Sequence, residues 1–391
     1  MPITQMQLAL FGRRVVTLFH FGVVEVVIIL LLVRWNSYIV RYGKYGKITL
    51  AFLAAFLGTW IISFMTNSSV AAYWRMYYLI YWIVPLLVLI ICSQRPIDAV
   101  KLTKSILVIA VIHACLIFYQ HFANDLLWPY SIDEEGKKLF FISSGYYNLG
   151  KYMDRCPGLC ISGLEAGLFL VFGILLVAIY PKMAKLKKAI LTFLFLIAIW
   201  FTGTRNIYVQ IAFVFGMSVL LKTQKISVKN KYVIGTIMTF LAMGLYLFLF
   251  SSMGTGVGTK NIRTDTLSVM LRAENWNGVI NRIKEGGILS ILFGQGVWQS
   301  AGFSLLIDNM YLELIVLSGF VGCVLYIVYW LGITRVLILD GSTTGYLFAS
   351  FVLSMFVYGI ANVAGNAFIT LSIVILILFN SKEKPAEEAR G

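Results

Sequence analysis

Long apolar stretches separated by short polar segments recur along the whole chain. A helix that crosses a bilayer needs about 20 mostly apolar residues, because each backbone N–H and C=O must find its partner within the segment. The stretches that meet this requirement lie at residues 15–33, 48–65, 77–92, 105–122, 163–180, 189–200, 207–221, 232–250, 310–331, 345–361 and 367–379. The pattern predicts an all-α polytopic membrane protein, a single integral membrane domain over 1–391 with about 11 (roughly 10 to 12) transmembrane helices. The first span has the weakest pattern because it contains His20 and Glu25.

The composition narrows the class of protein. Hydrophobic residues make up 60% of the chain and charged residues 13%, whereas soluble domains are about 25% charged. Five cysteines are too few for a disulfide-rich scaffold, and 15% aromatic residues exclude a disordered chain. The net charge of +15 could suggest a nucleic-acid partner in a soluble protein. In a membrane protein it indicates topology, so no nucleic-acid partner is expected.

Positive charge in short loops predicts the orientation, because such loops keep Lys and Arg on the cytoplasmic side. Four alternate loops carry the cations Arg34, Arg41, Lys44, Lys47, Arg95, Lys101, Lys104, Lys182, Lys185, Lys187, Lys188, Lys222, Lys225, Lys229 and Lys231. The two short loops on the other side hold only Arg75 and Arg205. The four loops and the C-terminal tail are therefore predicted to be cytoplasmic. The N-terminus is then predicted outside, although Arg13 and Arg14 favour an additional or re-entrant segment there.

This orientation places two long loops, at residues 123–162 and 251–308, outside the cytoplasm. Long connections without spans of their own are typical of binding loops or lids, so function is expected there. Within the second loop, residues 266–285 have the apolar period of an amphipathic helix that ends at Gly286-Gly287. Such a helix either lies at the membrane interface and only shapes the loop or contributes cations to a site. The chain contains no phosphate-binding loop, Rossmann glycine run or acidic metal cluster, so direct use of ATP or nucleotide sugars is not expected.

Several short motifs follow one another on the predicted outer face. They are TGTRN at 202–206, RxxNW at 272–276, FGQG at 293–296 and DNMYLELIVLSGFVG at 308–322, with PGLCISGLEAG at 157–167 before a span. In this order they resemble the bacterial O-antigen polymerase (Wzy) and O-antigen ligase superfamily. The resemblance covers roughly Arg155 to Gly322, while the N-terminal spans match only in hydropathy.

The resemblance implies a GT-C-like helical membrane fold and a glycosyltransferase without metal or cofactor, in the bacterial inner (plasma) membrane. Its active site is expected on the periplasmic side, where the sugar donor is linked to undecaprenyl diphosphate. Cleavage of that bond builds negative charge on the departing phosphate. Without a metal, fixed guanidinium groups are suited to hold it.

Arginine side chains are the candidate diphosphate ligands. Arg205 ends a predicted span and is the first candidate, with a snorkelling interfacial arginine as the alternative. Arg272 matches the arginine of the family's outer-loop helix. Arg282 follows ten residues later, about 80° round the helix, so both can face one anion, although Arg282 can equally be an ordinary exposed charge. Arg155 is a weaker candidate for a diphosphate or an acidic glycan.

The acceptor hydroxyl must lose a proton, and Asp308 is the candidate base. Asp308 can instead cap the following helix. Asn309 and Tyr311 are predicted as substrate-binding neighbours. The ligase branch typically has a histidine at the position of Asp308. The histidines of this chain lie outside the motifs and are interpreted as packed or interfacial residues: His20, His113 and His121.

Two acidic residues and two cysteines complete the candidate set. Glu165 and Glu313 lie just inside predicted spans, where a carboxylate either acts on the substrate or orients an arginine. Cys156 and Cys160 are either bridged or free thiols.

The leading functional hypothesis is a polymerase that moves a growing glycan from undecaprenyl diphosphate onto a newly arrived lipid-linked repeat unit. Its expected partners are these lipid-linked donor and acceptor oligosaccharides and membrane lipid, and the resemblance adds a chain-length-regulating co-polymerase. The alternatives are an O-antigen ligase acting on the lipid A core, a flippase for the lipid-linked unit and a noncatalytic membrane partner. The absence of an internal repeat disfavours the flippase.

Overall fold

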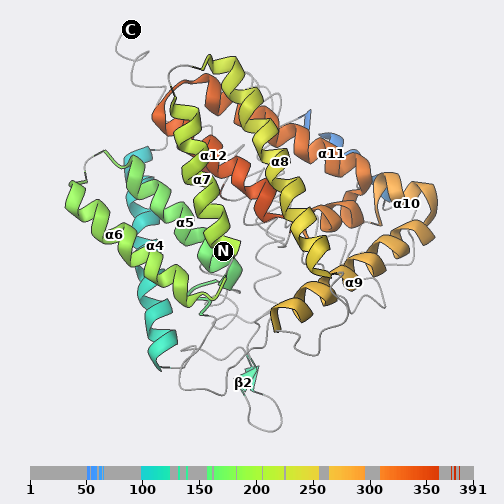
Figure 1. The fold of residues 1–391 in the computed structure, drawn as a ribbon, viewed down its shortest axis with the longest axis horizontal. Coiled ribbons are helices and arrows are strands. Elements are labelled where there is room, and N and C mark those ends of the chain that lie inside the picture. The colour runs from blue at the N-terminus through green and yellow to red at the C-terminus, as the bar shows by residue number, and fades with distance from the viewer. Residues whose placement is uncertain are drawn as a thin grey trace, which may run out of the picture. The chain divides into compact units, whose positions relative to one another are not determined.

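The computed structural model describes the chain in segments. They are residues 51–52, 54–59, 61–63, 65, 98–123, 131–132, 138–139, 156–160, 163–181, 183–204, 206–223, 226–254, 264–295, 309–360, 371, 374–375 and 378. Regular structure in these segments is helical, apart from the short antiparallel pair of β1 (Ser131–Ile132) and β2 (Lys138–Leu139) (Figure 1). The prediction of an all-helical fold is therefore confirmed for the described segments, apart from this short strand pair.

Among the described residues, three helices are long and apolar enough to cross a membrane: α4 (Ala99–Ala123), the Val228–Phe248 part of α8 (Val228–Gly254), and α11 (Met310–Leu339). Shorter apolar helices are Ala54–Ser63, α5 (Gly163–Ile179), α7 (Asn206–Lys222) and α12 (Thr343–Tyr358). The remaining helices are α6 (Lys185–Phe201), α9 (Thr264–Glu285) and α10 (Gly287–Phe293). The protein is therefore a membrane protein, as predicted.

Helices α4 to α8, α11 and α12 occupy the segments in which spans were predicted between residues 105 and 361. The predicted spans at 15–33 and 77–92 lie outside the described residues, and those at 48–65 and 367–379 are described in part. Helix α9 occupies the segment of the predicted amphipathic helix at 266–285. The total of about 11 spans stays a prediction.

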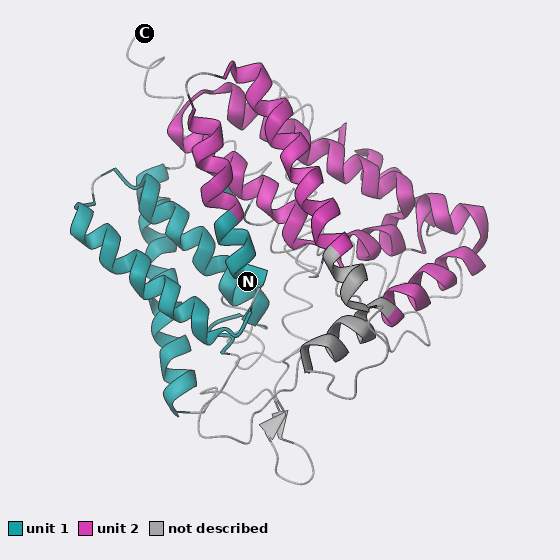
Figure 2. Cartoon of the chain, in the orientation of Figure 1, with its two compact units in different colours: residues 1–34, 87–212, 367–391 teal, residues 35–86, 213–366 magenta. Residues whose placement is uncertain are grey.

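The chain divides into two compact units (Figure 2). Unit 1 comprises residues 1–34, 87–212 and 367–391, and unit 2 comprises residues 35–86 and 213–366. In unit 1, α4, α5 and α6 pack against one another. A β-carbon on Gly173 would lie 3.1 Å from Phe195 and 3.4 Å from Ala110, so a small residue is needed where these helices meet.

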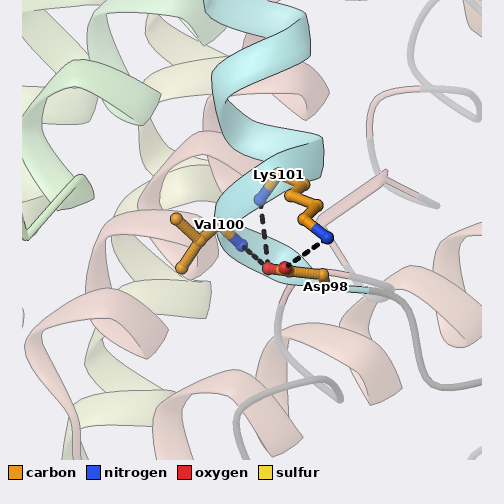
Figure 3. A network of polar contacts seen from close by, with 3 residues as sticks. All are labelled: Asp98, Val100 and Lys101. Atoms are coloured by element: carbon orange, nitrogen blue, oxygen red, sulfur yellow. Dashed lines mark hydrogen bonds and ion pairs between the residues drawn. The ribbon is translucent and has the colours of Figure 1, made fainter.

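Helix α4 begins at an Asp98 cap (Figure 3). Asp98 Oδ1 accepts hydrogen bonds from the backbone N–H groups of Val100 and Lys101, at 2.9 and 3.1 Å. Lys101 Nζ lies 3.7 Å from Asp98 Oδ2. These contacts satisfy two of the N–H groups that a helix start leaves without partners, and they lower the pKa of Asp98.

In unit 2, α8 packs on α11 and α12, while α9 and α10 pack on α11. Helix α11 is broken at Gly319, whose φ of 69° and ψ of −175° are not helical. Tyr326 Oη lies 3.8 Å from Met310 Sδ, whereas a straight helix would separate these residues by about 24 Å. Residues 310–318 and 320–339 therefore form a helical hairpin with its bend at Gly319.

Candidate functional site

Two of the predicted catalytic residues, Arg205 and Asp308, lie outside the part of the chain that the structure describes. The predicted substrate-binding residue Arg155 lies outside it as well. Arg272 is described only as part of the α9 backbone. Their catalytic roles stay predictions, and the described candidates are Arg282, Asn309, Tyr311, Glu313 and Glu165.

The start of α11 is capped by Asn309, which corrects the proposal that Asp308 caps this helix. Asn309 Oδ1 accepts hydrogen bonds from the N–H groups of Tyr311 and Leu312, at 2.9 and 3.0 Å. The Met310 N–H donates to the carbonyl of Gly359 at 2.8 Å, and the Glu313 N–H donates to that of Asn309 at 3.0 Å. Capping requires an extended backbone, and Asn309 has it, with φ −150° and ψ 115°.

These contacts decide what the start of α11 can bind. The N–H groups of residues 310–313 are all used, and both Asn309 and Met310 are buried. An open helix N-terminus binds anions because its N–H groups are free, and transporters with broken helices use such ends. These four N–H groups are therefore not available to an anion, and side-chain cations are the better candidates to hold one here.

Tyr311 is engaged by the neighbouring helices. Its hydroxyl donates a hydrogen bond of 2.7 Å to the carbonyl of Phe356 near the end of α12, and Met243 Sδ of α8 lies 3.9 Å from the same oxygen. Together with the Met310–Gly359 bond, this contact fixes the start of α11 against the end of α12. The observed role of Tyr311 is structural, and its predicted role in substrate binding stays a prediction.

Glu313 is a buried carboxylate in the first turn of α11, with 7% of its surface exposed. Its Oε2 has no hydrogen-bond partner among the described residues. An unsatisfied buried polar group costs about 1–3 kcal/mol. A residue retained at that cost is a candidate for function, and Glu313 is the strongest described one.

Helix α9 packs on the first segment of α11. Val279 and Ile283 are buried against Val316, with Leu312 and Ile315 beside them. The apolar face of α9 is therefore covered by protein in this region. Helix α9 thus does more than lie at the membrane interface, because it packs on α11. The packing places the helix that carries Arg272 and Arg282 against the helix that Asn309 caps.

Gln295 ties the two helices together. Its side-chain N–H donates to the carbonyl of Arg282 at 3.3 Å, and its backbone N–H donates to the carbonyl of Val316 at 2.7 Å. Arg282 itself is partly exposed. The FGQG motif thus links the end of α9 to the first segment of α11, a role that the linear sequence did not reveal.

In unit 1, two polar residues of α4 hold the turn at 156–160. The Gln120 side chain accepts a 2.7 Å hydrogen bond from the Gly158 N–H and donates one of 3.1 Å to the Gly158 carbonyl. His113 Nδ1 accepts a 2.9 Å bond from the Leu159 N–H. Gly158 has φ +57°, and a β-carbon there would overlap His113. His113 and Gln120 are two helical turns apart on one face of α4. This spacing of two polar residues in an apolar helix is the sequence signal that could have revealed their shared role.

The same turn contacts the last residue of α6. The Cys156 N–H donates a 3.0 Å bond to the carbonyl of Phe201. Phe201 also stacks on His121, with ring centroids 4.0 Å apart, so both described histidines are packed as interpreted. Glu165 lies in the first turn of α5 and is partly exposed.

Cys156 and Cys160 are both buried and are not bridged to each other, which decides between the two alternatives left open by the sequence. Burial raises the pKa of the Cys160 thiol to about 12. The thiol is thus protonated at neutral pH and unreactive, because the thiolate is the nucleophile.

The described segments contain no group of three or more His, Cys, Asp or Glu residues placed to hold a metal ion. The residues brought together in unit 2 are a capped helix start, a buried carboxylate and a cation-bearing helix.

No protein-family model matches the chain, and no curated protein matches it significantly.

Proposed function

We propose that the protein is a glycosyltransferase that polymerises lipid-linked repeat units at the periplasmic face of a bacterial inner membrane, with about 11 spans in a GT-C-like arrangement. It transfers the growing glycan from undecaprenyl diphosphate to the terminal sugar of a new lipid-linked unit. The observation that carries the proposal is the packing of α9 on the first segment of α11, bridged by Gln295. Two motifs that carry the resemblance, FGQG and the one at 308–322, meet here, and the helix that carries the RxxNW motif packs on them.

In the proposed reaction, the acceptor hydroxyl oxygen attacks the anomeric carbon of the donor glycan. The carbon–oxygen bond to the diphosphate breaks, its electron pair leaves with the diphosphate, and the hydroxyl proton passes to a base. Arg205 and Arg272 are the proposed diphosphate ligands, with Arg282 and Arg155 in support, since guanidinium stays charged at any relevant pH. The use of the N–H groups of residues 310–313 within the protein supports this choice of side-chain cations.

Asp308 is the proposed base. In the sequence it directly precedes Asn309, which supplies the capping oxygen at the start of α11. Glu313, one turn further along, is proposed to orient a substrate group or an arginine. In the ligase alternative the same donor chemistry serves a lipid A core acceptor.

The test is a surface-glycan gel of the native host with and without the gene, paired with analysis of its lipid-linked intermediates. A polymerase deletion collapses the ladder to core bearing a single repeat. Core without any repeat, together with accumulation of long lipid-linked polymer, would identify a ligase. An unchanged ladder and unchanged intermediates would reject both enzymes.

Arginine variants test the proposed site in the same assay. Arg205→Ala or Arg272→Ala should abolish polymer while the protein remains folded in the membrane, and Arg282→Ala should shorten the ladder. Lys284→Ala is the matched control, because Lys284 is an exposed cation near the end of the same α9 helix. Normal polymer in both Arg205→Ala and Arg272→Ala would eliminate the proposed clamp.

A further inference from the structure

Helix α10 turns an apolar face away from the protein. Ile288, Leu289 and Ile291 are 72%, 48% and 38% exposed, whereas Ser290, the one polar side chain of this helix, is buried. The helix lies at the rim of unit 2, beside the bend of α11 (Figure 1). Adjacent exposed apolar residues of this kind mark a surface that contacts lipid or another protein.

The contact of α10 with Gly319 sets the level of this face relative to the membrane. Residues 320–339 of α11 rise about 30 Å as a helix, which matches the thickness of the hydrocarbon core of a bilayer, about 30 Å. This segment therefore reaches from one membrane surface, at Gly319, to the other, at Leu339. A β-carbon on Gly319 would overlap the carbonyl of Leu292, the sixth residue of α10. Helix α10 thus lies at the membrane surface that Gly319 marks.

An exposed apolar stripe of α11 begins at the same surface. Phe320, Val324 and Val328 follow one another at four-residue steps, so they share one side of the helix, and they are 57%, 39% and 60% exposed. In a segment that crosses the membrane, such a stripe faces the acyl chains. The exposed residues of α10 therefore lie at the level where the lipid-facing surface of α11 begins.

The charged residues next to this face precede α10 and include two cations. Arg282 and Lys284 lie in the last turn of α9, and the exposed Glu285 follows them. Cations beside apolar residues are typical of helices at a membrane interface, where the cations meet lipid phosphates and the apolar residues enter the acyl layer. A second copy of the chain that docked by the same face would bring like net charge against like. The charge therefore favours lipid as the occupant.

We propose that α10 is a membrane anchor whose residues Ile288, Leu289 and Ile291 insert between the lipids at the surface that Gly319 marks. Because only a short turn joins the two helices, the anchor holds the end of α9 at the level of the lipid head groups. This contact with the bilayer does not require the proposed reaction, so either can fail without the other.

Photo-crosslinking of the full-length protein in nanodiscs of phosphatidylethanolamine and phosphatidylglycerol tests the lipid contact. The photoreactive residue p-benzoylphenylalanine replaces Ile288, Phe320 as the lipid-facing control, or Glu285 as the exposed control at the end of α9. Mass spectrometry should detect lipid adducts at Ile288 and Phe320 at least tenfold more often than at Glu285. Adducts at Phe320 without adducts at Ile288, or crosslinked dimers in place of lipid adducts at Ile288, would overturn the proposal.

Melting temperatures in the same nanodiscs distinguish lipid from water at this face. Ile288 is the second residue of α10, where an aspartate in water is favourable because of the helix dipole. Ile288→Asp should nevertheless lower the melting temperature, because it brings a charge into the lipid layer, and Ile288→Leu should leave it unchanged. A melting temperature of Ile288→Asp equal to or above that of the wild type would show that the face meets water and overturn the proposal.

Discussion

Gly294 and Gly319 are in direct backbone contact, so close that neither position can accept a β-carbon. A β-carbon on Gly294 would lie 2.5 Å from the amide nitrogen of Gly319 and 2.7 Å from that of Ser318. One on Gly319 would overlap the carbonyl of Leu292. Both glycines have positive φ, 80° and 69°. The contact packs the end of α10 onto the bend of the α11 hairpin and explains why FGQG and SGFVG contain glycines at these positions.

Gly319→Ala should destabilise unit 2 severely. A residue with a β-carbon in this conformation costs about 1–3 kcal/mol, and the overlap with Leu292 adds to that cost. The measurement is thermal unfolding in detergent. Gly332→Ala, in the same helix but with no atom within 4 Å of the added carbon, is the control and should leave the melting temperature almost unchanged. Equal melting temperatures for the two variants would refute the packed bend.

Asn309→Ala should cost about 1 kcal/mol of stability, because it removes the cap that accepts the Tyr311 and Leu312 N–H groups. Asn309→Asp should retain most of it, since aspartate caps equally well. Chemical unfolding in detergent measures the difference. A stability loss in the aspartate variant as large as in the alanine variant would contradict a capping role.

Glu313→Met should stabilise the protein by about 1–3 kcal/mol, because it replaces a buried carboxylate oxygen that has no described partner. If Glu313 serves the proposed reaction, the same variant should lose polymer. Thermal unfolding and the surface-glycan ladder report the two effects separately. The exposed Glu285→Met is the control and should change neither. A less stable Glu313→Met protein would show that the carboxylate is structural.

Gln120→Met should lower stability by about 1–3 kcal/mol, because the buried N–H and C=O of Gly158 lose their partners. Protease cleavage at the 156–160 turn should accelerate as well. The neighbouring Tyr119→Phe, at a position 43% exposed, should have little effect on either measurement. Unchanged stability and unchanged protease cleavage in Gln120→Met would show that Gln120 does not hold the turn at 156–160.

The start of α4 should weaken at acidic pH. Hydrogen bonds from the backbone of Lys101, above all, hold the pKa of Asp98 below its usual 3.8. A lowered pKa means that the ionised carboxylate stabilises the folded state above pH 3.8 and that this contribution is lost as the pH falls through the folded-state pKa. Asp98→Ala should therefore be less stable than the wild type at neutral pH, and the two melting temperatures should converge as the pH falls through the folded-state pKa of Asp98. A difference in melting temperature that does not change with pH would show that ionisation of Asp98 does not stabilise the folded state.

The sequence by itself determined where the helices lie. The apolar stretches at 105–122, 232–250 and 310–331 predicted α4, α8 and α11, and the apolar period at 266–285 predicted α9. These predictions succeed because helix formation depends on residues within a few turns of one another, and because the membrane requires each spanning segment to satisfy its own backbone.

Only the tertiary structure decided how α11 is broken, which residue caps it and which polar groups are buried. The bend at Gly319 depends on Gly294, and the turn at Gly158 depends on Gln120, which is 38 residues away in the chain. Lys231 matches a loop cation in sequence, yet its contact with Tyr346 buries it. Such contacts join residues that are distant in sequence and depend on close packing in space, which hydropathy and periodicity do not encode.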